Sequence, residues 1–330
     1  MKLLKPIVLA SVFAVCFTCE NNDLVSDDSN MKLKAKDPIF MDLGNTMRTI
    51  KVKNKIDGLS KSANSAKAAK SYNVALYMAE YITAGDTEEM GNIVYFNNRG
   101  NKQLQGDFVP GLALDGTNAI SYYVDDNRPS LDLDVVVSNN AIDRAMNTWD
   151  GIICSNLGMF EIAYDGRDTG FIAGIIGEIL GEDFGGSQSY VADVLHAGWL
   201  PARAFDLVAP NGSQFILGVT YTIVFTDEEG NLIDTDNNGK YDVAWREIYY
   251  NDNFSWDDGN HYDVETIALH EAGHGLSQGH FGKAFRNIKT GKLHFSPRAV
   301  MNAAYSGIQT TIDESDLAGH CSNWSSWFNN

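Results

Sequence analysis

The chain is poor in histidine, in cysteine and in basic side chains. Its 330 residues include only 7 histidines and 4 cysteines, and 43 acidic residues outnumber 25 lysines and arginines, for a net charge of −18. Proteins that bind nucleic acid need a basic face, so this balance argues against a nucleic-acid partner. The sequence also lacks a glycine-rich loop that could cradle a phosphate, and it lacks a nucleophile elbow.

Apolar runs of membrane-spanning length are missing as well. Lys2 and Lys5 precede a short apolar run over residues 7–18, which is typical of an export signal and too short to cross a bilayer. Cys19 and a polar, acidic stretch follow, and this pattern resembles a bacterial lipoprotein signal with Cys19 as the lipidated residue. We therefore expect an exported protein, anchored at the outer membrane or cell surface through Cys19 alone. A plain cleaved signal and an extracellular protein are the alternative.

Export would leave two other cysteines, Cys154 and Cys321, far apart in the sequence. An exported pair can form a disulfide, which would close a long loop and stabilise the fold by up to ~4–5 kcal/mol in the chain-entropy model. Two buried thiols are the other interpretation, and the sequence does not decide between them.

The few histidines are concentrated in one place, because five of the seven fall within residues 261–294. His270 and His274 are four residues apart, so on a helix their rings lie on one face and can share a metal ion. Glu271, beside the first histidine, can act as general base on a water held by that ion. His280 follows beyond the expected helix end and would complete three nitrogen ligands of a catalytic Zn²⁺ site with an open position. A helix with surface histidines is the alternative.

These residues resemble the metzincin metalloproteases, whose pattern is HExxHxxGxxH followed by a methionine turn. His270, Glu271, His274 and His280 match the pattern, whereas Ser277 stands where the family has glycine. That glycine permits a left-handed bend before the third histidine, so serine there implies strain of about 1 kcal/mol. Gly275 and Gly279 flank the position and could relocate the bend.

Downstream residues resemble the matrixin branch of this family. Met301 matches the methionine turn, in which methionine forms an apolar floor under the zinc, and Tyr305 matches the segment that walls the substrate pocket. Matrixins usually have proline where this chain has Ala303, and an ordinary core methionine is the alternative for Met301. No cysteine occurs over residues 20–153, so the thiol latency switch of animal matrixins is absent.

The resemblance implies an α+β catalytic domain with a mostly parallel twisted sheet, an active-site helix and a small C-terminal subdomain. It implies an extended peptide substrate that pairs with an edge strand over residues 216–225. Periodicity predicts helices over residues 139–153, 171–181 and 263–276, with Asn139 or Asn140 capping the first and Asp263 the last. Strands are expected over residues 119–124, 160–164, 191–195, 216–225 and 245–250.

Composition divides the chain into four parts. Residues 1–18 are the expected signal peptide, and residues 19–70 a polar tether containing a basic low-complexity arm. Residues 71–114 are interpreted as an N-terminal extension or pro-segment, and residues 115–330 as the metalloprotease catalytic domain. The basic arm could lie over an acidic cleft and inhibit it, or it could be only a spacer.

A second candidate metal site precedes the histidine motif. Asp234, Asp236, Asn238 and Asp242 have the spacing of the first oxygen ligands of an EF-hand calcium loop, with glycine at the sixth position. Trp245 replaces the final glutamate, so the loop is incomplete. Bound Ca²⁺ would pin this hairpin, and a solvated turn is the alternative.

The sequence therefore predicts a monomeric zinc endopeptidase that acts on proteins or peptides, with Glu271 as general base. One alternative is a non-catalytic surface lipoprotein that uses zinc or its acidic face for adhesion. Another is a zinc amidase that cleaves cell-wall peptides.

Overall fold

The computed structural model describes residues 30–52, 70–96 and 106–327. The expected signal peptide, Cys19 and much of the basic arm lie outside these residues, so their interpretations remain predictions. Among the described residues, no helix is long and apolar enough to span a membrane.

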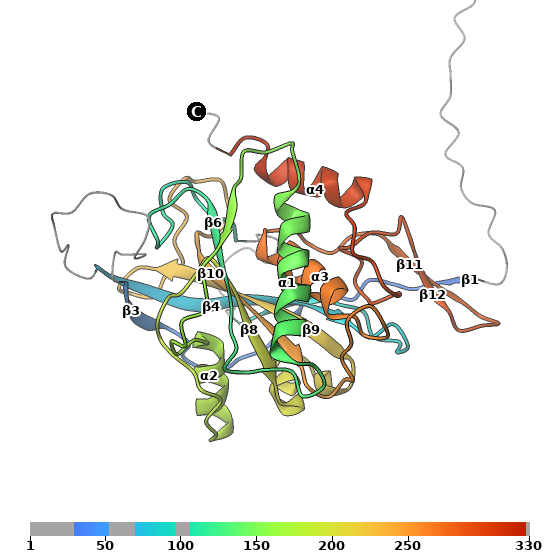
Figure 1. Ribbon diagram of the computed structural model, residues 1–330. Helices are drawn as coiled ribbons and strands as arrows, with labels where there is room; N and C mark the ends of the chain where they lie inside the picture. Colours follow the sequence, from blue (N-terminus) through green and yellow to red (C-terminus); the bar gives the residue numbers. More distant parts are fainter. Residues whose placement is uncertain (1–29, 53–69, 97–105, 328–330) are drawn as a thin grey trace, which may run out of the picture.

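A nine-stranded sheet organises the molecule (Figure 1). Its order is β2-β5-β4-β9-β10-β8-β6-β7, and β3 pairs with β4 beside this path. The strands are β2 Ile39–Phe40, β3 Arg48–Val52, β4 Lys70–Thr83, β5 Ile93–Tyr95, β6 Ile120–Val124, β7 Met159–Glu161, β8 Val194–Leu200, β9 Ile216–Thr226 and β10 Val243–Asn251. The central strands β8, β9 and β10 are buried along their whole length, as expected for strands covered on both faces.

The sheet is mixed rather than mostly parallel. From β10 to β7 the neighbouring strands are parallel, whereas β9 is antiparallel to both β10 and β4. On the far side, β3 and β5 are antiparallel to β4, and β2 is parallel to β5. The prediction of a mostly parallel sheet therefore holds only from β10 to β7, and β9 with the N-terminal strands makes the sheet mixed.

Helices cover both faces of this sheet. Helices α1 Val135–Asp150 and α3 Val264–Gly275 pack against each other on one face, and α2 Phe171–Leu180 lies on the other (Figure 1). The short 3₁₀ helices η1 Ala202–Leu207 and η2 Gly212–Gln214 lead into β9. Two buried apolar clusters result, one that includes α1 and α3 and one that includes α2.

Helix α1 begins earlier than the sequence predicted. Its N-cap is Asp134, whose side chain accepts the Val136 N–H, rather than Asn139 or Asn140. Val136 is 64 % exposed and Ile153 is 97 % exposed, so apolar residues at both ends do not mark the buried face. The prediction was wrong here because it placed the cap at an asparagine inside the helix and counted Ile153, which lies beyond the helix end, as part of the apolar face.

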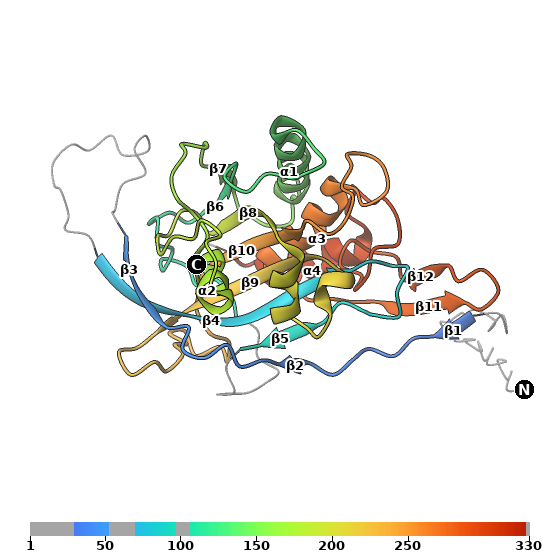
Figure 2. The ribbon, with the colours of Figure 1, turned by 90° about the horizontal axis from the view of Figure 1, so that it is seen from below.

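Residues 283–324 form a smaller part beside the main sheet. Strand β1 Asn30–Lys32 pairs with β11 Lys283–Asn287, which pairs with β12 Leu293–Ser296 in a separate three-stranded sheet (Figure 2). Helix α4 Glu314–Trp324 follows and starts with a capping box between Asp313 and Asp316.

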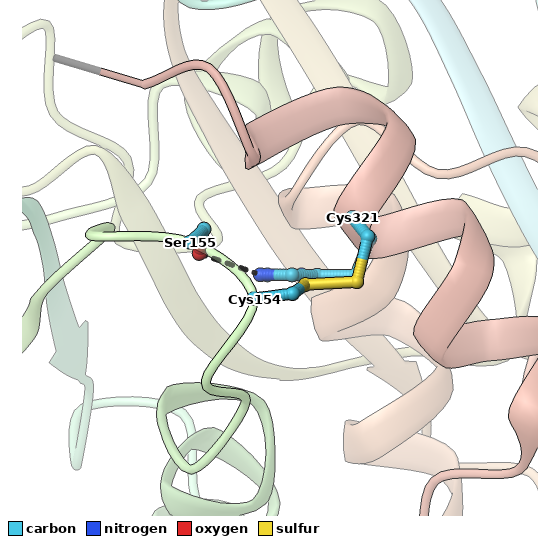
Figure 3. Close-up of a disulfide and its surroundings, with 4 residues drawn as sticks. Cys154, Ser155 and Cys321 are labelled. Atoms are coloured by element: carbon cyan, nitrogen blue, oxygen red, sulfur yellow. Dashed lines mark hydrogen bonds between the residues drawn. A yellow bond between two sulfur atoms is a disulfide. The ribbon is translucent and has the colours of Figure 1, made fainter. Parts of the chain in front are cut away.

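A disulfide joins Cys154, just after α1, to Cys321 in α4 (Figure 3). The beginning and end of the expected catalytic domain are therefore linked across a sequence separation of 167 residues. Beside the bond, the Ser155 hydroxyl lies 3.4 Å from His320 Nε2. Of the two interpretations that the sequence left open, the structure has the disulfide.

Residues 70–96 belong to the same folded body as the strands that follow. Strand β4 is paired with β9 on one side and with β3 and β5 on the other. The boundary expected at residue 115 therefore does not coincide with an edge of the sheet. Periodicity could not show this, because strand pairing between distant segments leaves no local pattern.

Candidate metal centre

Three histidine nitrogens converge where α3 ends. His280 Nε2 lies 3.2 Å from His270 Nε2 and 3.1 Å from His274 Nε2. His270 and His274 project from one face of α3, and His280 comes from the chain that turns back after it. The structure thus brings together the three residues that the sequence spacing selected, as a group that could hold one metal ion.

Backbone carbonyls fix the orientation of the two helix histidines. His270 Nδ1 lies 2.7 Å from the Val300 carbonyl oxygen, and His274 Nδ1 lies 2.7 Å from the Gln278 carbonyl oxygen. Each Nδ1 therefore carries the proton that it donates, which leaves an Nε2 lone pair directed at the cluster. This hydrogen-bond arrangement is the one that metal-binding imidazoles need.

Burial keeps these imidazoles neutral. It lowers the pKa of His270 to about 4, and it lowers the pKa values of His274 and His280 well below the usual range, with a further contribution from the neighbouring rings. Neutral imidazole is the form that binds a cation. The site thus fits a divalent metal ion at neutral pH.

The bend between the second and third histidines stays at Ser277. Its φ is +65°, in the left-handed region that favours glycine, whereas neither Gly275 nor Gly279 has a positive φ. Arg246 Nη1 donates to the Ser277 hydroxyl at 3.0 Å and to the Gly275 carbonyl at 2.9 Å. These bonds from a buried arginine offset strain of about 1 kcal/mol.

Glu271 is fully buried and faces the sheet. Its Oε2 accepts the Thr220 hydroxyl of β9 at 2.6 Å, and its Oε1 accepts the Ile82 N–H of β4 at 3.3 Å. A Cβ on Gly218 would lie 2.9 Å from Glu271 Cγ, so only glycine allows the side chain this position against β9. Burial raises the pKa of Glu271 well above its usual range.

Glu80 of β4 is a second buried carboxyl at the centre, and sequence reasoning missed it. Its Oε2 lies 3.5 Å from His274 Nδ1, and its Oε1 has no hydrogen-bond partner. Burial raises the pKa of Glu80 to about 8, against the opposing charge of Arg246. Since the pKa of His274 is lowered, this contact is not an ordinary ion pair. A divalent cation nearby would compensate the charge of such a carboxyl.

Met301 is buried beneath the histidine helix. A Cβ on Gly273, which lies between the two helix histidines, would come within 2.3 Å of Met301 Sδ. Asp316 of α4 accepts the backbone N–H groups of Val300 and Met301 and so holds this turn in place. Met301 therefore lies against α3 between the two helix histidines, and its role as a floor under a zinc ion stays a prediction.

Other segments of the protein already occupy the backbone groups of Tyr305 and β9 that were expected to bind a substrate. The Tyr305 N–H donates to the Thr83 carbonyl at 2.8 Å, and Ala304 pairs with Thr83 in a parallel bridge. Strand β9 is paired on both sides, by β4 and β10, so the expectation that residues 216–225 form an open edge is wrong. The β4 strand already occupies the edge at which a peptide was expected to add.

A hollow of about 630 Å³ reaches the cluster at His280. The side chain of His280 is the least buried of the three. The hollow is partly lined by basic residues of the N-terminal segment and of β11, namely Lys32, Lys34, Lys36 and Lys283. The hollow is thus more basic than a chain with a net charge of −18 would lead one to expect.

The second candidate metal site has a different character. Carboxylate oxygens of Asp234, Asp236 and Asp242 lie within 4.8 Å of one another, in a loop that is largely exposed. Asn238 turns its amide N–H groups toward Asp236 and Asp107, while its oxygen accepts the Lys240 N–H. The structure thus groups the three aspartates, and it uses Asn238 as a donor rather than as a free oxygen ligand.

Asp107 joins this acidic loop from a distant part of the sequence. Asp107 forms an isolated bridge with Asp242, and its Oδ1 is buried without a partner. Burial raises the pKa values of both carboxyls, and the neighbouring Asp236 adds to the effect. This contact brings a fourth acid to the loop that no local motif indicated.

Comparison with known proteins gave no match for this chain. No family model matches the chain, and no curated protein matches it. The functional argument therefore depends on the side chains themselves.

Proposed function

We propose that this protein is a zinc-dependent endopeptidase, similar to the metzincins of the matrixin branch. The observation that carries the proposal is the convergence of three imidazole nitrogens, with Glu271 on the same helix and against β9. A purely structural metal site has no use for a carboxylate next to its ligands. The proposal includes an exported chain, attached to a membrane through a lipid on Cys19 or released.

Each residue has a role in this proposal. His270, His274 and His280 would hold Zn²⁺, which supplies an acidified water and polarises a substrate carbonyl. Glu271 would accept a proton from that water and deliver it to the amide nitrogen that leaves. Met301 supports the histidine helix from below, and Tyr305 offers a backbone N–H to a bound peptide.

Replacing Glu271 by glutamine tests the chemistry without disturbing the ligands. We expect Glu271→Gln to keep one zinc per chain and to lose peptide cleavage by 10²–10⁴-fold, the range for a general base, or ~3–5 kcal/mol in the barrier. Glu88→Gln, a similar change in an exposed side chain, is the control.

Substrate panels separate this proposal from its rivals. Casein and cell-wall peptides should be compared with and without a zinc chelator. Chelator-sensitive cleavage of cell-wall peptides alone would identify an amidase, and full activity in Glu271→Gln would contradict the endopeptidase.

A further inference from the structure

Strand β4 is added to β9 in the manner of a bound peptide. The two strands lie side by side in the sheet (Figure 2) and are antiparallel. Their register runs from Asn73 opposite Thr226 to Thr83 opposite Ile216. β10 takes the other side of β9, so β4 satisfies the edge that would otherwise be open. Adding an extended segment to a sheet edge is a common way of binding peptides.

The C-terminal end of β4 contacts Glu271, the proposed general base. The Ile82 N–H donates to Glu271 Oε1 at 3.3 Å. In amide hydrolysis, the base returns its proton to the nitrogen of the bond that breaks. If Glu271 is the general base, the Ile82 nitrogen thus lies on the side of a leaving nitrogen, and Tyr81–Ile82 is a peptide bond in contact with Glu271.

The carbonyl of the same peptide bond lies on the side of the metal ligands. A Cβ on Gly91 would be 2.3 Å from the Tyr81 oxygen and 2.9 Å from His280 Cε1. The Tyr81 carbonyl and the His280 ring are therefore close neighbours around one point. A bound substrate would be expected to place its carbonyl near the metal ligands and its amide N–H near the general base, as the Tyr81 carbonyl and the Ile82 N–H do here.

Contacts beyond the bond hold the segment on its other side. The Thr83 carbonyl accepts the Tyr305 N–H at 2.8 Å, and the Thr83 hydroxyl donates to the Glu89 carbonyl at 2.9 Å. The Ile82 side chain is 3 % exposed and belongs to the apolar cluster that contains Tyr262 and Tyr305. The segment is thus gripped through its backbone and through a buried branched side chain.

We propose that residues 80–83 are a built-in pseudo-substrate that keeps the site latent until the end of β4 leaves β9. The proposal rests on the proposed function. It also assigns a substrate class: extended peptides that run antiparallel to β9, with an aromatic residue before the cleaved bond and a branched aliphatic residue after it. Glu271 is fully buried in the closed form, so no external carbonyl reaches it while β4 is in place.

Access of a small chelating probe to the metal tests the covering strand without relying on catalysis. Full-length protein loaded with Co²⁺ is titrated with acetohydroxamate, and binding is followed by the visible absorption of the metal. The apparent affinity for the probe equals the affinity of the open form multiplied by the fraction of molecules that are open. We expect Ile82→Ala, which weakens the grip on the strand end, to bind the probe at least about tenfold more tightly than the unaltered chain.

Val74→Ala is the matched control, because Val74 is also a buried β-branched residue of β4 and pairs with Phe225 far from the histidines. It should bind the probe like the unaltered chain. Thr83→Ala, which removes the hydroxyl contacts with the Glu89 and Ala303 carbonyls, is a milder second variant should Ile82→Ala fold poorly. Equal probe affinity in all of these proteins, or an equal gain in Val74→Ala, overturns the pseudo-substrate.

Cleavage assays on the same variants separate the two proposals. A peptide with the sequence of residues 77–84 should be cleaved between its second tyrosine and isoleucine, faster by Ile82→Ala than by the unaltered chain, and a version with aspartate in place of isoleucine should resist. Probe access that depends on Ile82 without cleavage of any peptide supports the covering strand and contradicts the peptidase. Cleavage with unrestricted probe access contradicts the covering strand alone.

Discussion

The histidine cluster and the aspartate loop are two groups of ligand-type side chains built in opposite ways. Two of the three histidines are oriented by backbone carbonyls, and burial keeps all three neutral and ready to bind a cation. Asp234, Asp236 and Asp242 are grouped in a mostly exposed loop, and backbone N–H groups such as that of Thr235 already occupy their oxygens. Only the first group is organised for a metal before the metal arrives.

This difference shows what a ligand motif needs besides spacing. Around the histidines, buried groups from distant strands complete the site, including Arg246 at the Ser277 bend and Glu80 beside His274. Around the aspartates, the loop supplies most of its own hydrogen bonds, so a cation would have to displace them. We therefore expect strong zinc binding at the first group, and at the second at most weak binding of Ca²⁺.

Removing one ligand from each group tests the comparison with the largest expected effect. His274→Ala should lower zinc affinity by more than about 100-fold, because only two of the three imidazole ligands remain. Asp236→Asn should leave zinc content unchanged and affect only a Ca²⁺-dependent rise in Tm. Zinc titration and thermal unfolding measure these results, and zinc loss in Asp236→Asn would erase the distinction.

Breaking the disulfide tests how much the stability and the zinc affinity of the histidine cluster depend on the link between Cys154 and Cys321. The double variant Cys154→Ser, Cys321→Ser should lower the free energy of unfolding by about 2–5 kcal/mol. Because α4 also holds Met301 through Asp316, zinc affinity should fall with stability, while the aspartate loop stays unchanged. Urea unfolding of both proteins checks this, and an unchanged midpoint would show that the link is dispensable.

The pH dependence of stability should show a smaller contrast, between buried histidines, including His196 of β8 outside the cluster, and the carboxyls of the aspartate loop. Burial lowers the pKa of His196 to about 3 and that of His270 to about 4, from 6.5. The unfolded chain then binds more protons, so stability present above pH 6.5 is lost as the pH falls toward 3–4. The raised pKa values of Asp107 and Asp242 act in the opposite sense, because the stability that these carboxyls contribute is lost as the pH rises.

Urea unfolding of the metal-free protein between pH 7 and pH 4 measures this dependence. His196→Gln should make the curve shallower by up to a few kcal/mol, and His294→Gln, which changes an exposed side chain, should leave it unaltered. An identical curve in His196→Gln would contradict the assignment.

Local patterns in the sequence anticipated those parts of the fold that depend on neighbours along the chain. Helix α3 has the predicted Asp263 N-cap, and its spacing brings His270 and His274 together. The strands β6, β9 and β10 also lie where alternation and β-branched residues placed them. His280 reaches the cluster because the chain bends at Ser277, as the motif implied.

The parts that the sequence did not predict depend on contacts between distant segments. Nothing local marks β4 as the partner of β9, nor Glu80 as a neighbour of His274, because both follow from a pairing across more than a hundred residues. The early start of α1 was missed for a local reason, since Val136 is apolar but exposed.

The central claim is that three imidazole nitrogens bind one zinc ion. X-ray absorption at the zinc edge of the full-length protein tests it most directly. The account predicts one zinc per chain with three imidazole donors at about 2.0–2.1 Å. A protein that binds no zinc at neutral pH, or a zinc shell with fewer than three imidazoles, would contradict it.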